Sequence, residues 1–283
     1  MCSDSIQAIL QHHSKQLESA LNLDLGSARI EAQCLLQNAL QVNRAWLLSH
    51  PEQPLNVEQH ARYSALFERR LSGEPVAYIL GEREFYGLTF KVTPATLIPR
   101  PETELLVDLA LQRIPKQSAC RVLDLGTGSG AIALSIAHAR PDTDVVAVDA
   151  SEGALEVAQY NAQQLNLDNV RLIVSDWFDA LQGERFDLIV SNPPYVAADD
   201  THLAQGDLRF EPRTALASGA DGLDDIRRIS TQAKAYLNVN GGLLLEHGYD
   251  QAARVRALLQ QAGFSGVFSA RDLSGIERVS GGT

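Results

Sequence analysis

The chain has 283 residues, of which 45% are hydrophobic and 21% charged, and its 24 Lys and Arg against 35 Asp and Glu give a net charge of -11. This length allows one large domain and one small one, each with its own core. The acidic balance argues against a nucleic-acid substrate, because binding a phosphate backbone needs a basic surface. No apolar run reaches about 18 residues and no signal-peptide core is seen, so we expect a cytoplasmic protein that does not bind membranes.

The three cysteines, Cys2, Cys34 and Cys120, are far apart in the sequence and form no Cys-x-x-Cys pair. Neither a disulfide framework nor a metal site is therefore expected. Cys34 falls on the apolar face of a predicted helix, so we expect its side chain in the core.

Residues 1–83 are predicted to form a small helical domain, because apolar residues recur there at helical spacing. No catalytic group of residues is visible in this region. Three helices are expected: one from Ile6 to Leu21, one capped by Ser27 and running to Leu40, and one that opens with the capping-box pair Asn56 and Gln59 and stops at Gly73.

Residues 84–97 are predicted to form a β-hairpin that links the helical domain to a larger one. Their apolar and polar residues alternate, and Gly87 is placed at the turn. Pro101, followed by Glu102 and Glu104, suits the first turn of a helix. The larger domain is therefore expected to span residues 98–283.

This larger domain is predicted to be a doubly wound, Rossmann-like α/β sheet with interleaved helices. Residues 264–270 and 276–280 are expected to add a terminal antiparallel hairpin. Residues 196–222 show little regular pattern and are a candidate lid over a substrate. The parallel strands are expected near residues 121–125, 144–149, 169–174, 185–191 and 241–246.

A glycine loop, Gly126-Thr127-Gly128-Ser129-Gly130, follows the first of these strands and precedes an apolar helix. Asp149 ends the next strand, 25 positions after Asp124, and a carboxylate there suits the two hydroxyls of a ribose. Read as Gly126, Gly128 and Ala131, the loop fits the G-x-G-x-x-A pattern of dinucleotide sites. Read as three alternate glycines, it fits a ligand without phosphate, such as S-adenosylmethionine.

The strand of residues 186–191 runs into Asn192-Pro193-Pro194-Tyr195, which we call the amide clamp. Its prolines have no N–H, so the turn offers hydrogen-bond acceptors without competing donors. Two acceptors can hold both hydrogens of a planar NH₂ group and stabilise the positive charge that develops on nitrogen during attack on an electrophile. A nicotinamide-dependent oxidoreductase has no need of this arrangement, whereas an S-adenosylmethionine methyltransferase does. The structural alternative is an ordinary Pro-rich turn capped by Asn192.

Further motifs lie on both sides of these two elements. They read GEPVAYILG at residues 73–81, EFYG at 84–87, LIPRPETE at 97–104, FEPRTAL at 210–216 and GADGL at 219–223. With the glycine loop and the amide clamp, they resemble the HemK/PrmC family of peptide chain release factor glutamine methyltransferases. The resemblance runs from about residue 20 to the end of the printed sequence.

The resemblance implies methyl transfer from S-adenosylmethionine to the side-chain amide nitrogen of the glutamine in the Gly-Gly-Gln motif of class I release factors. It implies that Asn192 and the Pro193 carbonyl accept the two N–H bonds of that amide, while Pro194 and Tyr195 shape the substrate pocket. It also implies that the helical domain docks the protein substrate.

The same resemblance implies the cofactor contacts. The residues from Gly126 to Gly130 would face the methionine and ribose, and Asp149 would bind the ribose hydroxyls. Trp177 would lie near the adenine, and Asn192 would touch both cofactor and substrate. No metal is implied, and a monomer is the working expectation.

Three other functions stay open at this point. A DNA adenine methyltransferase is the leading alternative, because adenine's exocyclic amine has the same planar chemistry, but no basic recognition element is visible. The others are a nicotinamide-dependent oxidoreductase and a non-catalytic cofactor-binding protein that docks on translation factors. Glu246 and His247, which end a predicted strand, are given a structural role, because a methylated amide loses its extra proton without a strong base.

Overall fold

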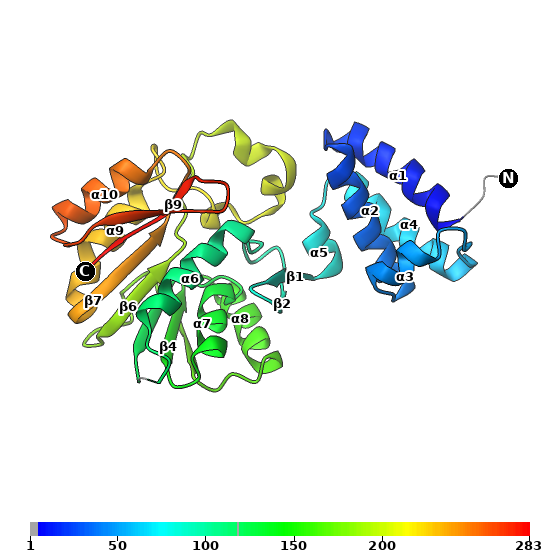
Figure 1. Cartoon of the computed structure of the whole chain (residues 1–283). Helices are drawn as coiled ribbons and strands as arrows, with labels where there is room; N and C mark the ends of the chain where they lie inside the picture. Colours follow the sequence, from blue (N-terminus) through cyan, green and yellow to red (C-terminus); the bar gives the residue numbers. More distant parts are fainter. Residues whose placement is uncertain (1–4, 118) are drawn as a thin grey trace. The chain divides into compact units, whose positions relative to one another are not determined.

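The protein is described here by a computed structural model that covers residues 5–117 and 119–283, so Cys2 lies outside the described residues. The chain divides into two compact units (Figure 1). The helical unit holds the residues up to Gly81 together with Ala204–Phe210, and the sheet unit holds Glu82–Leu203 and Glu211–Thr283. Over the described residues, no helix combines the length and apolar character that crossing a membrane requires.

The helical unit is built from helices that pack around one apolar core. Leu17, Leu35 and Tyr63 are completely buried there, together with other apolar side chains. The helices are α1 (Ile6–Leu21), α2 (Leu25–Leu40), α3 (Arg44–Ser49), α4 (Val57–Leu71) and α5 (Val76–Leu80).

Helix caps explain where α2 and α4 begin. Asn56 and Gln59 form the predicted capping box at α4, each side chain accepting a hydrogen bond from the other's backbone N–H. The prediction that Ser27 caps α2 is wrong. Asp24 is the N-cap, because its carboxylate accepts the backbone N–H of Ser27 at 3.0 Å and places Ser27 inside the first turn.

The prediction that Cys34 belongs to the core is also wrong, since its side chain is only partly buried. The buried apolar positions of α2 follow a stripe three or four residues apart, and Cys34 lies beside this stripe rather than on it. The stripe consists of Ala28, Ala32, Leu35, Leu36 and Ala39.

The sheet unit contains a seven-stranded sheet with the order β5-β4-β3-β6-β7-β9-β8. The first five strands in that order are parallel, β9 is antiparallel to β7, and β8 is antiparallel to β9, so the predicted doubly wound sheet with a terminal hairpin is confirmed. The strands are β3 (Arg121–Leu125), β4 (Asp144–Asp149), β5 (Val170–Val174), β6 (Phe186–Ser191), β7 (Leu237–Glu246), β8 (Phe268–Arg271) and β9 (Glu277–Gly282).

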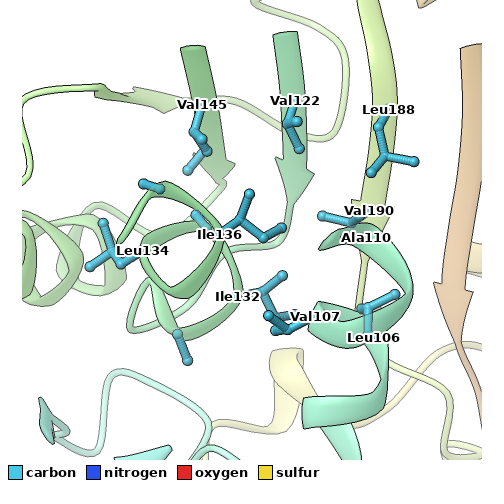
Figure 2. Close-up of a cluster of buried hydrophobic side chains, with 14 of the residues drawn as sticks. Leu106, Val107, Ala110, Val122, Ile132, Leu134, Ile136, Val145, Leu188 and Val190 are labelled. Carbon is cyan, nitrogen blue, oxygen red and sulfur yellow. The ribbon is translucent and has the colours of Figure 1, made fainter. Parts of the chain in front are cut away.

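Helices cover both faces of this sheet, which is why its central strands read as continuous apolar runs. Successive residues of β3 point to opposite faces: Val122 packs with α6 and α7, and Leu123 belongs to the core cluster of the other face. Figure 2 shows the first cluster, with Val107 of α6 and Ile136 of α7 beneath the strands. The helices are α6 (Glu104–Arg113), α7 (Ala131–Ala139), α8 (Glu152–Gln164), α9 (Asp224–Ala233) and α10 (Ala252–Gln261).

The hairpin begins before the predicted range of residues 84–97 and ends before residue 92, although its turn falls at Gly87 as expected. It consists of β1 (Glu82–Phe85) and β2 (Leu88–Lys91), which pair in antiparallel register. Tyr86 and Gly87 form its turn with φ values of 53° and 75°. Two successive left-handed residues match the type I′ turn that suits two-residue hairpins.

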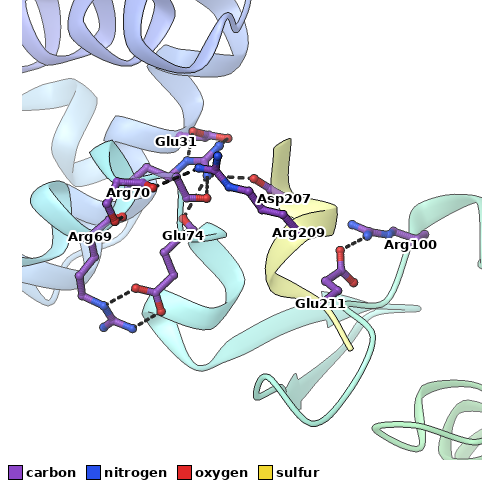
Figure 3. Close-up of polar contacts among 10 residues, drawn as sticks. Glu31, Arg69, Arg70, Glu74, Arg100, Asp207, Arg209 and Glu211 are labelled. Carbon is purple, nitrogen blue, oxygen red and sulfur yellow. Dashed lines mark hydrogen bonds and ion pairs between the residues drawn. The ribbon is translucent and has the colours of Figure 1, made fainter. Parts of the chain in front are cut away.

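The long connection after β6 contains the short 3₁₀ helices η2 (Thr201–Ala204), η3 (Gly206–Phe210) and η4 (Arg213–Ala215). Its segment Ala204–Phe210 belongs to the helical unit. Arg70 of α4 holds that segment by donating to Asp207 Oδ1 at 2.9 Å, and the same guanidinium donates to both carboxylate oxygens of Glu31 (Figure 3). Arg209 donates to the Ser72 carbonyl.

Candidate active site

The glycine loop and the amide clamp meet at one edge of the sheet. Strands β3 and β6 are parallel neighbours in which Leu125 pairs with Ser191, so Gly126 and Asn192 leave adjacent strands at the same level. The Ser191 hydroxyl donates to the Leu125 carbonyl at 2.7 Å and ties the two strand ends together. The chain order of the strands reverses between β3 and β6, and ligands of open α/β sheets bind at such a point.

A cavity of about 360 Å³ opens at this edge. Its size falls within the range of roughly 300–1,000 Å³ that is typical of small-molecule sites. Six predicted site residues line it: Gly126, Gly128, Asp149, Trp177, Asn192 and Pro194. Lining residues that the sequence reasoning missed include Ala95, Thr96, Leu97, Asp176, Pro212, Thr214 and Asp225.

The remaining residues of the glycine loop lie behind the cavity and support it. The Thr127 hydroxyl donates to Asp124 Oδ2 at 2.6 Å, and the Ser129 carbonyl accepts a hydrogen bond from the Asn161 amide at 2.8 Å. Gly130 caps α7 with φ of 84°, and a Cβ there would lie 2.9 Å from Leu134. The positive φ therefore favours glycine at position 130, and a larger residue would also press on the Leu134 side chain.

Asp149 both stabilises the loop and faces the cavity. Its Oδ2 accepts the backbone N–H of Gly128 and its Oδ1 that of Ser151, each at 2.9 Å. A carboxylate oxygen has two lone pairs, so both atoms keep acceptor capacity for a ligand's hydroxyl groups. Its predicted role in ribose binding stays a prediction.

Asp124 is a completely buried carboxyl next to this site. Burial raises its pKa to about 7, the Thr127 hydroxyl opposes that shift, and the nearby charge of Asp149 adds to it. Across the part of the chain that the structure describes, Asp124 Oδ1 has no hydrogen-bond partner. A buried carboxyl with an incompletely satisfied oxygen and a perturbed pKa is typical of a functional site.

Trp177 forms one wall of the cavity. Its backbone has φ of 53°, a left-handed conformation that is strained for a bulky residue. The indole N–H donates to Asp225 Oδ1 at 3.2 Å, and the Ser175 hydroxyl donates to the Trp177 carbonyl at 2.9 Å. A Cβ on Gly126 would meet the indole ring at 3.4 Å, so the glycine loop lies directly against that ring.

The amide clamp is held from behind by polar contacts. Asn192 Nδ2 donates to the Thr103 hydroxyl at 3.2 Å, and the Tyr195 hydroxyl donates to Glu246 Oε1 at 3.4 Å. Burial, with a further contribution from the charge of Glu246, raises the pKa of Tyr195. Pro193 is buried in the turn between them. Neither Pro193 nor Tyr195 lines the cavity.

The segment after the clamp folds back on it. The backbone N–H of Val196 donates to the Leu216 carbonyl and that of Ser218 to the Val196 carbonyl, each at 2.9 Å. Gly222 packs so closely that a Cβ would lie 2.3 Å from the Tyr195 carbonyl oxygen. The same carbonyl accepts a hydrogen bond from Gln251 Nε2 at 2.9 Å. The GADGL motif therefore provides the close packing that fixes the clamp.

Glu211 joins two walls of the cavity. Its carboxylate is buried, accepts the backbone N–H of Ile98 at 3.0 Å and forms an ion pair with Arg100 (Figure 3). The neighbouring lining residues Leu97 and Pro212 come from the two segments that Glu211 connects. Charged residues in the LIPRPETE and FEPRTAL motifs thus hold these segments together.

Comparisons with known proteins agree with this geometry. The Methyltransferase small domain family matches residues 103–219, and the PrmC N-terminal domain family matches residues 8–81. The chain is 53% identical over 260 residues to the release factor glutamine methyltransferase of Bordetella pertussis, covering 92% of this chain and 96% of that protein. The corresponding protein of Burkholderia pseudomallei is 54% identical over 260 residues, covering 89% of this chain and 91% of that protein.

A solved methyltransferase of Pyrococcus furiosus shares the fold, with a TM-score of 0.53 at 20% identity over 77% of this chain and 96% of that chain. The family resemblance inferred from the sequence motifs is confirmed by the two bacterial relatives, which match nearly their whole length. The chain therefore belongs to the family of release factor glutamine methyltransferases.

Proposed function

We propose that this protein transfers a methyl group from S-adenosylmethionine to the side-chain amide nitrogen of the glutamine in the Gly-Gly-Gln motif of class I release factors. Its family membership supports this reaction. The observation that carries the proposal is the single cavity that both the glycine loop and Asn192 line, where a cofactor and a planar amide would meet.

The residues of the cavity fit S-adenosylmethionine. Gly128 offers open backbone, with nothing within 4 Å of a Cβ built on it. Asp149 offers acceptors for ribose hydroxyls, and the face of Trp177 offers a stacking surface for adenine. When bound, S-adenosylmethionine supplies an electrophilic methyl group on a sulfonium.

The amide clamp would act on the substrate nitrogen. An amide nitrogen is a weak nucleophile, because its lone pair is delocalised into the carbonyl. Asn192 Oδ1 and the Pro193 carbonyl would accept its two N–H bonds, fix its plane and stabilise the positive charge that develops on it. The extra proton of the methylated amide then passes to solvent, so no strong base is required.

We further propose that the helical unit docks the release factor. This unit carries its own cavity of about 650 Å³, whose lining includes Leu10, Leu25, Leu48, Lys15 and Arg29. Leu25 and Leu48 are 48% and 52% exposed, so the cavity presents apolar side chains beside two cations. A monomer that acts in the cytoplasm and does not bind nucleic acid suits a protein substrate, and these points are part of the proposal.

A labelling experiment tests the reaction. The protein is incubated with methyl-labelled S-adenosylmethionine and a class I release factor, and the label is located by peptide mass spectrometry. We expect one methyl group on the glutamine of the Gly-Gly-Gln motif. A release factor in which that glutamine is replaced by glutamate is the matched control and should stay unlabelled.

Two outcomes would contradict the proposal. Label on adenine in a parallel incubation with duplex DNA, without label on the release factor, would favour a DNA methyltransferase. Binding of S-adenosylmethionine without label on any substrate would favour a non-catalytic binding protein.

A further inference from the structure

Side chains from three segments meet behind the Asn192 amide. Thr103 lies where α6 begins, Glu246 ends β7, and Tyr195 closes the amide clamp. Thr103 and Glu246 are only 4% and 2% exposed, so solvent has little access to either group. The LIPRPETE motif brings Thr103 to this place, although no catalytic step of the proposed function uses it.

Hydrogen bonds join these side chains in two pairs. Asn192 Nδ2 donates to Thr103 Oγ1 at 3.2 Å, and the Tyr195 hydroxyl donates to Glu246 Oε1 at 3.4 Å. Burial raises the pKa of Glu246 to about 7, and a hydrogen bond from the Thr103 side chain opposes that shift. Thr103 thus lies between the Asn192 amide and a buried carboxyl.

The direction of the hydrogen bonds decides which end of the Asn192 amide faces the cavity. At a pH above its pKa of about 7, Glu246 is ionised and only accepts hydrogen bonds, so the Thr103 hydroxyl donates to it and offers Asn192 a lone pair. That lone pair accepts the N–H of Asn192 Nδ2, which leaves Oδ1 as the end of the amide available to a ligand. A reversed amide would turn its own donors toward a substrate NH₂ group and could not hold it.

We propose that Thr103 and Glu246 are positioning residues that fix the orientation of the Asn192 amide and so aim its oxygen at the NH₂ group of the substrate. This inference rests on the proposed function, because it requires that Asn192 accept a hydrogen bond from the substrate amide. Sequence reasoning gave Glu246 only a structural role. The contacts through Thr103 connect Glu246 to the reacting group without making it a base.

Two isosteric substitutions test the orientation. Thr103→Val removes the hydroxyl but keeps the branched shape. Glu246→Gln replaces a carboxylate, which only accepts hydrogen bonds at a pH above its pKa of about 7, with an amide that can donate to Thr103. We expect each to lower kcat by about 10- to 100-fold, less than the loss on removing a direct transition-state contact. The Kd for S-adenosylmethionine should stay within about twofold, because neither residue lines the cavity.

Thr103→Ser is the matched control. It keeps the hydroxyl and should retain kcat within about threefold of the unchanged protein, since serine can make the same hydrogen bonds. Circular dichroism and thermal unfolding establish that all three variants fold. If Thr103→Val does not fold, the comparison of Glu246→Gln with the unchanged protein still tests the proposal.

A double-mutant cycle separates positioning from a general structural effect. Because Thr103 acts through Asn192, adding Thr103→Val to Asn192→Ala should lower kcat no further than Asn192→Ala alone. The proposal would be overturned if the loss of kcat in the double variant equalled the product of the losses in the two single variants. A normal kcat in both Thr103→Val and Glu246→Gln would also overturn it. If the unchanged protein methylates no glutamine, the proposed function fails instead, and the two failures are distinguishable.

Discussion

Arg70 in the helical unit and Glu246 in the sheet unit are both buried charged residues, but their surroundings differ. Arg70 donates to Glu31, to Asp207 and to the carbonyls of Gly73 and Glu74. Glu246 accepts a long hydrogen bond from Tyr195 at Oε1 and interacts with Thr103, but within residues 5–117 and 119–283 its Oε2 has no partner. Every nitrogen of the guanidinium donates a hydrogen bond, whereas one oxygen of the carboxyl has no partner in the described chain.

This difference shows where the fold tolerates unfavourable groups. Asp124, the other carboxyl whose pKa is raised to about 7, also lies at the carboxyl edge of the sheet and also has an oxygen without a partner in the described chain. Such groups cost stability and persist where function requires them. Substitutions in the charged network of the helical unit should therefore lower the free energy of unfolding. Substitutions at the carboxyl edge of the sheet should mainly lower the methylation activity.

The largest expected effect is the loss of activity in Asn192→Ala. Removing the acceptor that faces the substrate should lower kcat/KM by about 10³-fold, equivalent to roughly 4 kcal/mol of transition-state stabilisation. The free energy of unfolding should change little, because the side chain borders a cavity. Methylation kinetics and urea unfolding measure the two quantities.

Asn38→Ala is the control for this substitution, since it removes the same amide group from α2 in the helical unit. It should leave methylation unchanged. Activity in Asn192→Ala within about tenfold of the unchanged protein would contradict the role of the amide clamp.

The second effect is a pH dependence of stability that comes from Glu246. Burial raises its pKa from 4.5 to about 7. At a pH below the pKa of Glu246 in the unfolded chain, the carboxyl is protonated in both the folded and the unfolded state, and its contribution to the free energy of unfolding is fully present. As pH rises through the folded pKa the contribution is lost, because the unfolded chain ionises first. The loss amounts to about 3 kcal/mol.

Glu246→Gln isolates this contribution, because it cannot ionise. The free energy of unfolding of the unchanged protein minus that of Glu246→Gln should decrease between about pH 4.5 and 7.5, when both are measured by urea unfolding in a pH series. A difference that is constant with pH, or that increases, would show that the carboxyl is ionised in the folded protein across this range.

The third effect is a loss of stability in Arg70→Met. The substitution leaves Glu31 and Asp207 without their cation, and breaking a buried pair costs up to about 3–5 kcal/mol. Their side chains keep 21% and 38% exposure, so we expect about 2 kcal/mol. Trp46 lies in the helical unit and Trp177 in the sheet unit, so Trp46 fluorescence in a Trp177→Phe background reports the helical unit.

Arg62→Met is the matched control for Arg70→Met. Arg62 pairs with Glu58 on the surface of α4, where the two side chains are 51% and 77% exposed. Such pairs contribute less than about 1 kcal/mol. An equal decrease in the free energy of unfolding in Arg70→Met and Arg62→Met would contradict the expected difference between a buried network and a surface ion pair.

Much of the fold could be predicted because its determinants are local in sequence. Apolar runs marked the parallel strands, and the glycine loop and Asn192 directly follow two of them. Thr103 and Glu246 could not be found in this way, because their contacts with the amide clamp span 89 and 51 residues. A threonine in a charged motif and a carboxylate at a strand end acquire a role only where the chain brings them together.

The position of the segment Ala204–Phe210 could not be predicted from its sequence either. Its sequence indicates only an irregular connection after the clamp. It belongs to the helical unit, where Asp207 contacts Arg70, which lies 137 positions away in the sequence. A buried arginine is rare without partners, but the sequence does not reveal that this one is buried.

The smallest expected effect concerns the start of α2, where two neighbouring polar residues both fit the pattern of a cap. The Asp24 carboxylate accepts the backbone N–H of Ser27, whereas Ser27 lies within the helix. Asp24→Ala should therefore lower the urea midpoint of the helical unit slightly, with the backbone N–H of Ser27 left to water. Ser27→Ala should leave it unchanged or raise it, because alanine is the better residue inside a helix. Trp46 fluorescence measures the urea midpoint of both variants. A lower midpoint in Ser27→Ala than in Asp24→Ala would mean that Ser27 is the N-cap.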